Sequence, residues 1–539
     1  MSLLRAFATV GSFTLLSRVT GFLRDILTAS FLGAGTAADA FLIAFQFPNL
    51  FRRLFAEGAF SAGFVPIFSR VLEKDGHDKA ADFANAAFAM LATVVFVFVV
   101  VMVILMPWAL YVIAPGFDRI PGQMDHTAEL ARIAFPYLLF ISLVSLQSGI
   151  TNSFDRFAAG AAAPIILNLT IAAFLLGGVE VGVRGDVAMA MGVTVAGMLQ
   201  YLWMARAVNR LGIHLKMTRP RLTPEVRDLM KRMLPVAFGA GIYQLNLMID
   251  KILATLVSVG AVSWLYYADR VNQLPVGVVG VAIGVALLPL LSRQIQAGSE
   301  DAAMANQNRA IEVCLLLTIP AAAGIWVLAG PITATLFERG AFTIRDRNAV
   351  AAALDAFALG LPAYVLNKAL TPGFFGRLDT KTPVIISGIA MGTNVVFSVT
   401  LMQFVGHVGI AAATSLSAWI NAGALGWVLH RRGHFKVDAR LFKRTPRIVA
   451  ASALMVAALL GVLTLAEAWL GSVFGGPDHP PAAEIVRVLV LVAAIGIGSA
   501  VYFTAVFALG AFSRADLAAF KRNASDAPHT PATPDVPAA

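Results

Sequence analysis

The feature that most limits the fold of this chain is a series of long apolar runs separated by short polar loops. A helix needs about 20 apolar residues to cross the hydrocarbon core of a bilayer. Fourteen runs reach that length: 6–32, 37–68, 82–113, 128–153, 160–180, 187–208, 233–257, 261–292, 309–332, 349–373, 383–404, 407–429, 446–469 and 485–511. Only 13% of the residues are charged, about half of what is usual for soluble domains. We therefore predict an all-α polytopic membrane protein with fourteen transmembrane helices.

The positive charges of the loops predict how the chain is oriented. The N-terminal side and every second loop carry 27 of the 41 Lys and Arg residues, whereas the opposite loops and their flanks carry 7. Basic loops stay in the cytoplasm, so both termini are expected there. The formal net charge of +10 then reflects membrane topology, and we predict no nucleic-acid partner. The stretch 1–16 is interpreted as the start of an uncleaved first helix.

An internal repeat divides the chain. Residues 64–70 (FVPIFSR) resemble residues 287–293 (LLPLLSR), and the same offset of 223 pairs Asn49 with Asn272. Parallel repeats predict two six-helix lobes, with a substrate path between them and two extra C-terminal helices. The predicted divisions are an N-lobe (1–208), a basic cytoplasmic linker (209–232), a C-lobe (233–430), a basic cytoplasmic loop (431–445), the extra helices (446–511) and a disordered tail (512–539).

Charged residues inside the first two helices of each lobe point to a polar cavity. A charge at the bilayer centre costs roughly 2.5–3.5 kcal/mol on the translocon scale. One interpretation is that these charges are paired ions that brace the helices. However, the arginines outnumber the carboxylates, which suggests a missing anion, and the guanidinium fork suits phosphate. The candidate substrate-binding residues are Arg18, Arg24, Asp25, Asp39, Asn49, Arg52, Arg53, Glu57 and Arg270.

A second polar set lies mainly in the C-lobe. Asn394 and Ser398 are one helical turn apart, and Asp250 and Thr414 lie on other predicted helices. These oxygen atoms are ligands of the kind that Na⁺ would use. Hydrogen bonding between helices by small polar side chains explains them equally well. We predict no other cofactor, and the single cysteine, Cys314, allows no intrachain disulfide.

The sequence lacks the motifs of the common enzyme classes. It contains no HExxH, CxxC, GxSxG or Walker-type loop. We therefore predict a transporter that is not an enzyme. Energy would come from an ion gradient, the membrane potential or the substrate gradient.

Two motifs carry a family resemblance. Residues 17–25 (SRVTGFLRD) and 47–61 (FPNLFRRLFAEGAFS) closely resemble the MurJ (MviN) family of bacterial lipid II flippases, in the multidrug/oligosaccharidyl-lipid/polysaccharide exporter superfamily. The resemblance covers residues 1–511 and implies a V-shaped, two-lobed transporter of the bacterial inner membrane. It implies essential arginines at Arg18, Arg24, Arg52 and Arg270, with Asp25, Asp39, Asn49 and Glu57 in the cavity.

The same resemblance implies the remaining parts of the mechanism. The two extra helices would form a hydrophobic groove for the lipid tail. In some members a sodium site uses residues that match Asp250, Asn394, Ser398 and Thr414, although Ser398 stands where a second carboxylate is expected. The substrate would be lipid II, carried by a monomer, and the cell-wall synthesis machinery is the expected protein partner.

Two alternatives remain open at this point. Another exporter of the superfamily, for lipid-linked oligosaccharides or drugs, would use carboxylates as the dominant cavity charge if its substrate were a cationic drug. A membrane-embedded glycosyltransferase would need a catalytic carboxylate in a sizeable outer loop, and the loops at 114–127 and 333–347 are poor candidates for one.

Overall fold

The computed structural model describes residues 3–52, 60–471, 473–474 and 481–513. Within these ranges the chain is all-helical. Its α-helices are α1 (Leu3–Leu32), α2 (Thr36–Phe51), α3 (Ser61–Ile113), α4 (Gln123–Ala134), α5 (Tyr137–Ser153), α6 (Ala158–Glu180), α7 (Gly185–Asn209), α8 (Pro224–Val257), α9 (Ala261–Pro275), α10 (Val281–Gln296), α11 (Glu300–Phe337), α12 (Ile344–Phe375), α13 (Lys381–Val405), α14 (His407–Arg431), α15 (Ala439–Leu470) and α16 (Pro481–Ala508). Two short turns are the 3₁₀ helix η2 (Pro115–Arg119) and the π-helix η3 (Val276–Gly280).

Ten of the predicted membrane segments coincide with helical spans that are long and apolar enough to cross a bilayer. The other four are also helical where the structure describes them, and they are the first two segments of each predicted lobe. They carry Arg18, Arg24, Arg52, Lys251 and Arg270, and segments 37–68 and 261–292 are each divided among several helices. The protein is therefore an all-helical polytopic membrane protein.

Helix boundaries differ from the prediction in the second segment of each half. Segment 37–68 is divided between α2 and α3, and segment 261–292 is divided between α9, η3 and α10. A proline lies near the end of the first helix in both cases, Pro48 in α2 and Pro275 in α9. Proline removes a helical hydrogen bond, which favours ending or distorting a helix there.

The predicted loop between segments 37–68 and 82–113 is also smaller than expected. The range of α3 (Ser61–Ile113) comprises two helices that meet at a kink at Gly76, where the backbone is not helical. The backbone φ angle of Gly76 is 85°, a conformation that glycine adopts at little cost.

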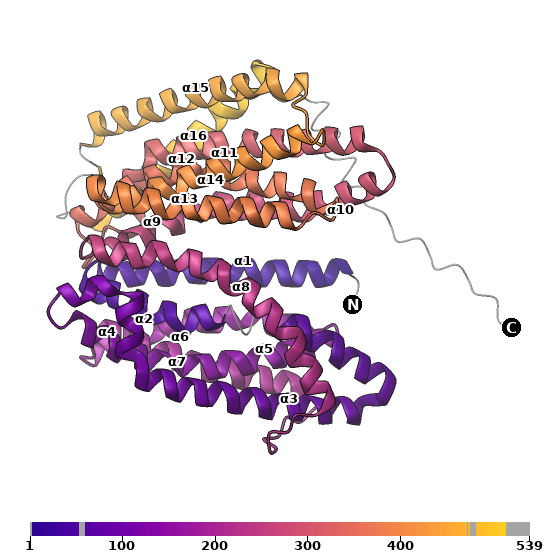
Figure 1. The fold of residues 1–539 in the computed structure, drawn as a ribbon. Helices are drawn as coiled ribbons and strands as arrows, with labels where there is room; N and C mark the ends of the chain where they lie inside the picture. Colours follow the sequence, from indigo (N-terminus) through magenta and orange to yellow (C-terminus); the bar gives the residue numbers. More distant parts are fainter. Residues whose placement is uncertain (1–2, 53–59, 472, 475–480, 514–539) are drawn as a thin grey trace.

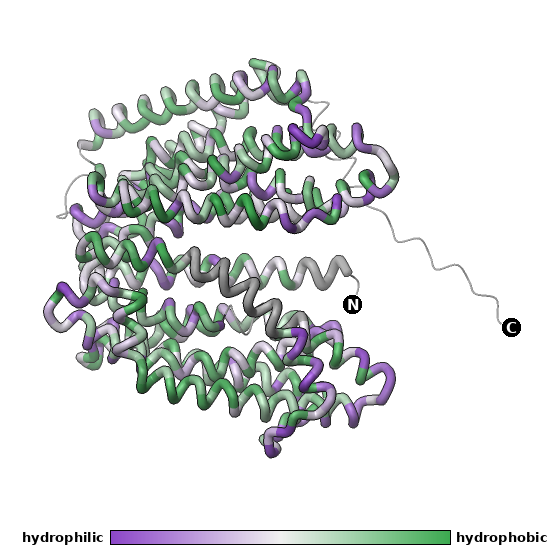
Figure 2. Tube along the Cα trace, viewed as in Figure 1, coloured by the Kyte–Doolittle hydropathy of each residue, from purple (hydrophilic) through white to green (hydrophobic). Residues whose placement is uncertain are grey.

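The helices form two bundles (Figure 1). Helices α1 to α7 make one bundle and α9 to α14 the other, and α8 runs between them. Helices α15 and α16 pack on each other and on α11, at the far side of the second bundle. Hydrophobic residues cover the lengths of the helices, and hydrophilic residues gather at many of their ends (Figure 2). The predicted disordered tail lies almost wholly outside the described residues.

Candidate functional site

An ionic network joins α1 of the first bundle to α9 of the second. Arg24 and Asp25 are adjacent on α1, with side chains only 8% and 3% exposed. Asp25 Oδ1 accepts hydrogen bonds from Arg24 Nη2 at 2.7 Å and from the Tyr266 hydroxyl at 2.8 Å. Asp25 Oδ2 forms an ion pair with Arg270 Nε at 3.0 Å. One buried carboxylate therefore holds arginines from both halves of the molecule.

Two residues that the sequence analysis did not select complete this network. The Tyr266 hydroxyl accepts hydrogen bonds from Arg270 at 2.9 Å and from Arg24 at 3.2 Å. The Arg270 guanidinium also lies 4.9 Å from the centre of the Tyr266 ring, a cation–π contact. Asn168 of α6 accepts from Arg24 at 3.0 Å and donates to the Ser17 carbonyl at 3.1 Å. Tyr266 therefore orients both Arg24 and Arg270, and Asn168 orients Arg24.

The network carries an excess of positive charge. Arg24 and Arg270 share the single carboxylate of Asp25, so these three groups sum to one positive charge. The Arg270 side chain is 38% exposed, whereas Asp25 is almost fully buried. Arg270 can therefore meet a ligand from the cavity while Asp25 still holds it. Such a site suits an anion with several acceptor oxygens.

Two other predicted arginines, Arg18 and Arg52, belong to the first bundle. Arg18 is exposed on α1, and its guanidinium packs so closely on Gly277 of η3 that a Cβ there would collide with it. Arg52, directly after α2, donates to Asn49 Oδ1 at 2.8 Å. Arg53 and Glu57 lie outside the described residues, so their predicted roles remain predictions.

A cavity of about 270 Å³ adjoins the network, between α2 of the first bundle and α8, α9, α12 and α14. It brings together members of both predicted sets, which are Asn49, Arg270, Asp250 and Thr414. The lining also includes Lys251, which donates to Gln46, and Asp269, which accepts from Gln273.

The structure places Asp39 at the N-terminus of α9. Its Oδ2 accepts from the Gly260 amide at 2.6 Å, and its Oδ1 accepts from the Ser263 amide and hydroxyl at 2.9 and 2.5 Å. A carboxylate at a helix N-terminus satisfies free amides and complements the helix dipole. Asp39 is absent from the residues that line the central cavity. Its contacts therefore favour a bridge between the bundles over the predicted substrate contact.

Close backbone contacts join the bundles at the same end of the molecule. Gly340, after α11, lies so close to the Ser30 carbonyl of α1 that a Cβ would collide, and the Ala341 amide donates to that carbonyl at 2.7 Å. Gly116 of η2 approaches the Thr255 carbonyl of α8 in the same way. The site is thus closed at the end of α1 that lies away from the N-terminus (Figure 1).

Three of the four candidate sodium ligands are directly connected. Asp250 accepts from Asn394 Nδ2 at 2.8 Å and from the Thr414 hydroxyl at 3.3 Å. Asn394 Oδ1 and Ser398 Oγ are buried and have no hydrogen-bond partner among the described residues. Buried oxygens without a partner are costly unless something else satisfies them, so the donor set fits a hard cation.

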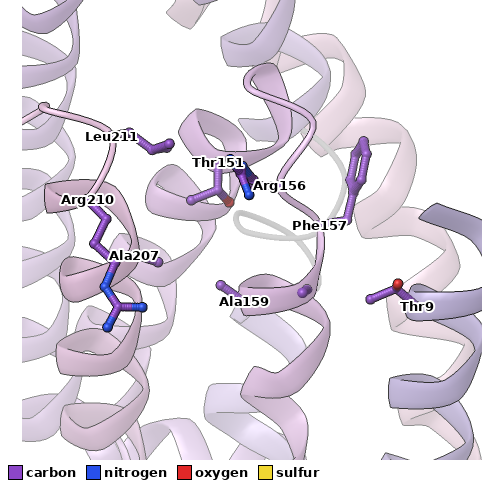
Figure 3. Close-up of a pocket in the computed structure, with 9 residues that line it drawn as sticks. Thr9, Thr151, Arg156, Phe157, Ala159, Ala207, Arg210 and Leu211 are labelled. Atoms are coloured by element: carbon purple, nitrogen blue, oxygen red, sulfur yellow. The ribbon is translucent and has the colours of Figure 1, made fainter. Parts of the chain in front are cut away.

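A separate cavity of about 380 Å³ lies near the N-terminal end of α1 (Figure 3). It is lined by Thr9, the turn that follows α5 and the end of α7. Arg156 and Arg210 are exposed there, and no carboxylate is among its lining residues. This cavity shares no lining residue with the central one and contains none of the candidate site residues.

Comparison with known proteins decides the family. A sequence model described as lipid II flippase MurJ matches residues 28–474. The chain belongs to the MurJ family. A probable lipid II flippase MurJ of Rhizobium meliloti is 43% identical over 519 residues, which cover 95% of each chain. The lipid II flippase MurJ of Burkholderia cenocepacia is 35% identical over 521 residues, which cover 95% of this chain and 98% of that protein.

Solved structures agree on the fold of this MurJ family member. A lipid II flippase MurJ in an inward closed conformation matches with a TM-score of 0.74 and 23% identity, covering 92% of this chain and 98% of that one. An inward-facing multidrug resistance transporter of the MATE family matches with a TM-score of 0.65 and 14% identity, covering 79% of this chain and 98% of that one. The family resemblance that rested on residues 17–25 and 47–61 is confirmed across nearly the whole sequence.

Proposed function

We propose that this membrane protein is a lipid II flippase that moves the undecaprenyl-pyrophosphate-linked peptidoglycan precursor from the inner to the outer leaflet. It acts as a transporter and performs no chemical conversion of its substrate. The observation that carries the proposal is the convergence of Arg24 and Arg270, from opposite bundles, on the one carboxylate of Asp25. A pyrophosphate group carries more negative charge than that carboxylate and has more acceptor oxygens. It can therefore recruit both arginines at once.

The mechanism is alternating access, in which two lobes of six transmembrane helices rock about the central site and two extra C-terminal helices stand beside the second lobe. In the state closed by Asp39 and the glycine contacts, the cavity faces the cytoplasm and admits the headgroup. Arg18 is exposed and Arg270 is half-buried, so these two arginines would meet the pyrophosphate first. Neutralising the excess positive charge removes repulsion between the bundles, which allows the closed end to separate. Arg52 would complete the anion site beside Asn49.

The electrical potential of the membrane can bias this cycle. Moving one net charge through the bilayer changes the free energy by about 2.3 kcal/mol for each 100 mV. We place the protein in the bacterial inner membrane with both termini in the cytoplasm. It would work there as a monomer alongside the cell-wall synthesis machinery.

Depletion of the protein in cells tests the proposed function. The expected result is that lipid II accumulates on the inner leaflet and that the cells lyse as wall synthesis stops. Labelling lipid II with a membrane-impermeant reagent on intact spheroplasts measures the outer-leaflet fraction. Normal wall synthesis and an unchanged outer-leaflet fraction would contradict the proposal.

A sodium ion at Asp250 is a separate proposal, and it predicts a stability effect. Sodium that binds only the folded protein stabilises it, by about 2.7 kcal/mol at one hundred times its dissociation constant. We expect NaCl to raise the Tm of the purified protein more than an equal concentration of choline chloride does. Asp250→Asn should remove that difference, because it removes the carboxylate that accepts hydrogen bonds from Asn394 and Thr414.

A distant carboxylate provides the control for the sodium proposal. Asp301 is exposed near the start of α11, and Asp301→Asn should keep the full sodium effect. Equal Tm values in the two salts for the wild-type protein would argue that these oxygens only connect helices.

A further inference from the structure

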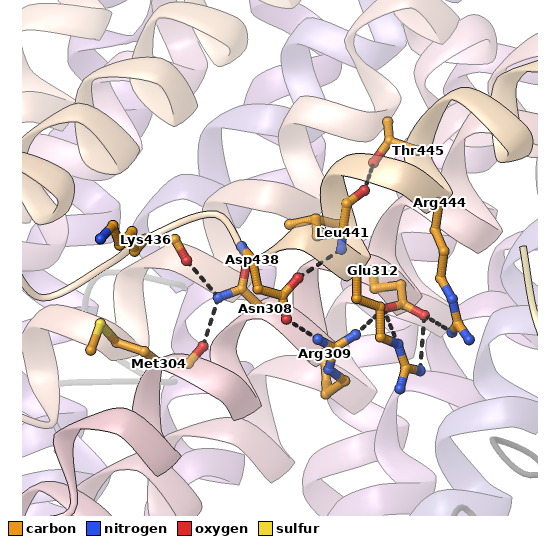
Figure 4. Close-up of polar contacts among 10 residues, drawn as sticks. Met304, Asn308, Arg309, Glu312, Lys436, Asp438, Leu441, Arg444 and Thr445 are labelled. Atoms are coloured by element: carbon orange, nitrogen blue, oxygen red, sulfur yellow. Dashed lines mark hydrogen bonds and ion pairs between the residues drawn. The ribbon is translucent and has the colours of Figure 1, made fainter.

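A cluster of arginines lies where α15 begins beside α11 (Figure 4). Its centre is Glu312 of α11, whose side chain is only 5% exposed. Arg440 donates to the two Glu312 oxygens at 3.1 and 3.2 Å, and Arg309 and Arg444 contact the same carboxylate. Arg309 also pairs with Asp438. Three arginines and two carboxylates leave one positive charge.

The positive charge continues along α15. Arg447 is exposed one turn after Arg444, and its Nη1 donates to the Gly510 carbonyl at 3.0 Å, just after α16. The Arg440 side chain is 39% exposed. One arginine would be enough to neutralise Glu312, so bracing alone does not explain this number of guanidinium groups. The exposed forks of Arg440 and Arg447 suit phosphate oxygens, and Arg444 adds a positive charge behind them. We call Arg440, Arg444 and Arg447 the mouth arginines.

An apolar cavity begins beside the mouth arginines. It is lined by Val313, Leu316, Leu317, Phe503, Val506, Phe507 and Phe512. Val313 directly follows Glu312 on α11, and Gly510, the partner of Arg447, stands between Phe507 and Phe512. An anion held by the mouth arginines would therefore have its apolar chain next to this cavity.

A second apolar cavity continues this path toward the central site. It has a volume of about 310 Å³ and shares Leu316, Leu317 and Phe503 with the first. It extends along α11, α15 and α16 as far as Pro275 of α9. Pro275 lies five residues after Arg270, so the path from the mouth arginines ends close to the ionic network. The hydrogen bond from the Tyr502 hydroxyl to the Leu316 carbonyl, at 2.5 Å, holds α16 on α11 at the point where the two cavities meet.

We propose that the mouth arginines are a first docking site for the pyrophosphate of the lipid-linked substrate, before its transfer to Arg24 and Arg270. The apolar cavities lie against α15 and α16, the helices that the family resemblance already assigns to the lipid tail, so only the arginine site is new. This inference rests on the proposed function. Charge complementarity and the continuity of the apolar path to Pro275 favour the polyprenyl substrate over an ordinary phospholipid, whose acyl chains have no need of a route to the central site.

Binding of undecaprenyl pyrophosphate to the purified protein tests the proposal. Native mass spectrometry in detergent would count the bound molecules, with undecaprenol and phosphatidylglycerol as comparison lipids. In an Arg270→Ala background, which weakens the central site, we expect one undecaprenyl pyrophosphate to remain bound. Adding Arg440→Gln and Arg447→Gln should weaken that binding about tenfold or more, since each charge-assisted hydrogen bond contributes strongly to affinity. Undecaprenol should bind with or without these changes.

Two further variants make the result specific. Arg447→Gln alone leaves every contact of Glu312 in place, so a loss of binding in this variant cannot come from misfolding of the cluster. Lys381→Gln, an exposed cytoplasmic charge at the start of α13, should have no effect.

The possible failures can be told apart. If the wild-type protein bound no undecaprenyl pyrophosphate, the proposed function itself would fail. If Arg270→Ala weakened binding but the mouth substitutions did not, only the docking site would be overturned. The docking site would also be overturned if phosphatidylglycerol bound as tightly as undecaprenyl pyrophosphate and displaced it completely. The arginine cluster would then be a general phospholipid site.

Discussion

Arg270→Ala should reduce lipid II flipping in reconstituted vesicles by about a hundredfold while the protein still inserts and purifies normally. Truncating one partner of a buried charge pair costs roughly 2–5 kcal/mol, and 1.4 kcal/mol corresponds to a factor of ten. The substitution leaves Arg24 and Asp25 as a neutral pair, so the network loses the positive charge that attracts the anion. It also removes the only arginine of the second bundle in that network, so the anion can no longer connect the two halves.

Two variants separate this effect from general damage. Arg270→Lys keeps the charge but loses the planar fork, so we expect an intermediate loss of about tenfold. Arg293→Ala removes an exposed arginine near the C-terminal end of α10 and should leave flipping unchanged. Wild-type flipping by Arg270→Ala would show that the network serves only to hold α9 on α1.

Asp39→Asn should open the end of the molecule that the structure shows closed. The carboxylate accepts three hydrogen bonds from Gly260 and Ser263, whereas an amide oxygen carries no charge and the amide NH₂ cannot accept. A loss of roughly 2–3 kcal/mol in the closed state would shift the equilibrium about 30- to 150-fold toward the open state. The rate of flipping should fall as the closed state becomes rarer, because the cavity would then seldom face the cytoplasm.

Thiol labelling from outside the cell measures this shift. Cys314 is the only cysteine and is buried, so Cys314→Ala gives a background for single-cysteine variants. Leu42 lines the central cavity, and Leu42→Cys should react with a membrane-impermeant reagent much faster when Asp39→Asn is present. Asp125→Asn changes an exposed carboxylate on α4 and should not raise labelling. No increase with Asp39→Asn would mean that these contacts do not control access.

Much of the fold could be predicted from the sequence because a bilayer imposes a simple length and polarity rule. Ten of the fourteen predicted segments coincide with helical spans of membrane-crossing length among the described residues. The division of the second segment in each half was not predicted. It depends on how the chain around Pro48 and Pro275 relieves the lost hydrogen bonds, and hydropathy does not record this.

The candidate site was predictable in its charges but not in its connections. The arginine excess was visible as a count, and the structure shows it as two arginines on Asp25. Asn168 could have been noticed as an isolated amide in the apolar run 160–180. Tyr266 gave a weaker signal, its spacing of four residues from Arg270. The contacts of Asp39 with α9 span 221 to 224 residues, and only the packing of the two bundles brings them together.

Equilibrium binding of lipid II to the purified protein tests the central claim most directly. The measured quantity is the Kd of radiolabelled lipid II in detergent, for the wild-type protein and for the double variant Arg24→Ala, Arg270→Ala. If these arginines bind the pyrophosphate, the Kd should rise at least about a hundredfold, because hydrogen bonds to charged groups contribute roughly 1.5–3 kcal/mol each. An unchanged Kd in a correctly folded double variant would contradict the claim that this network is the anion site.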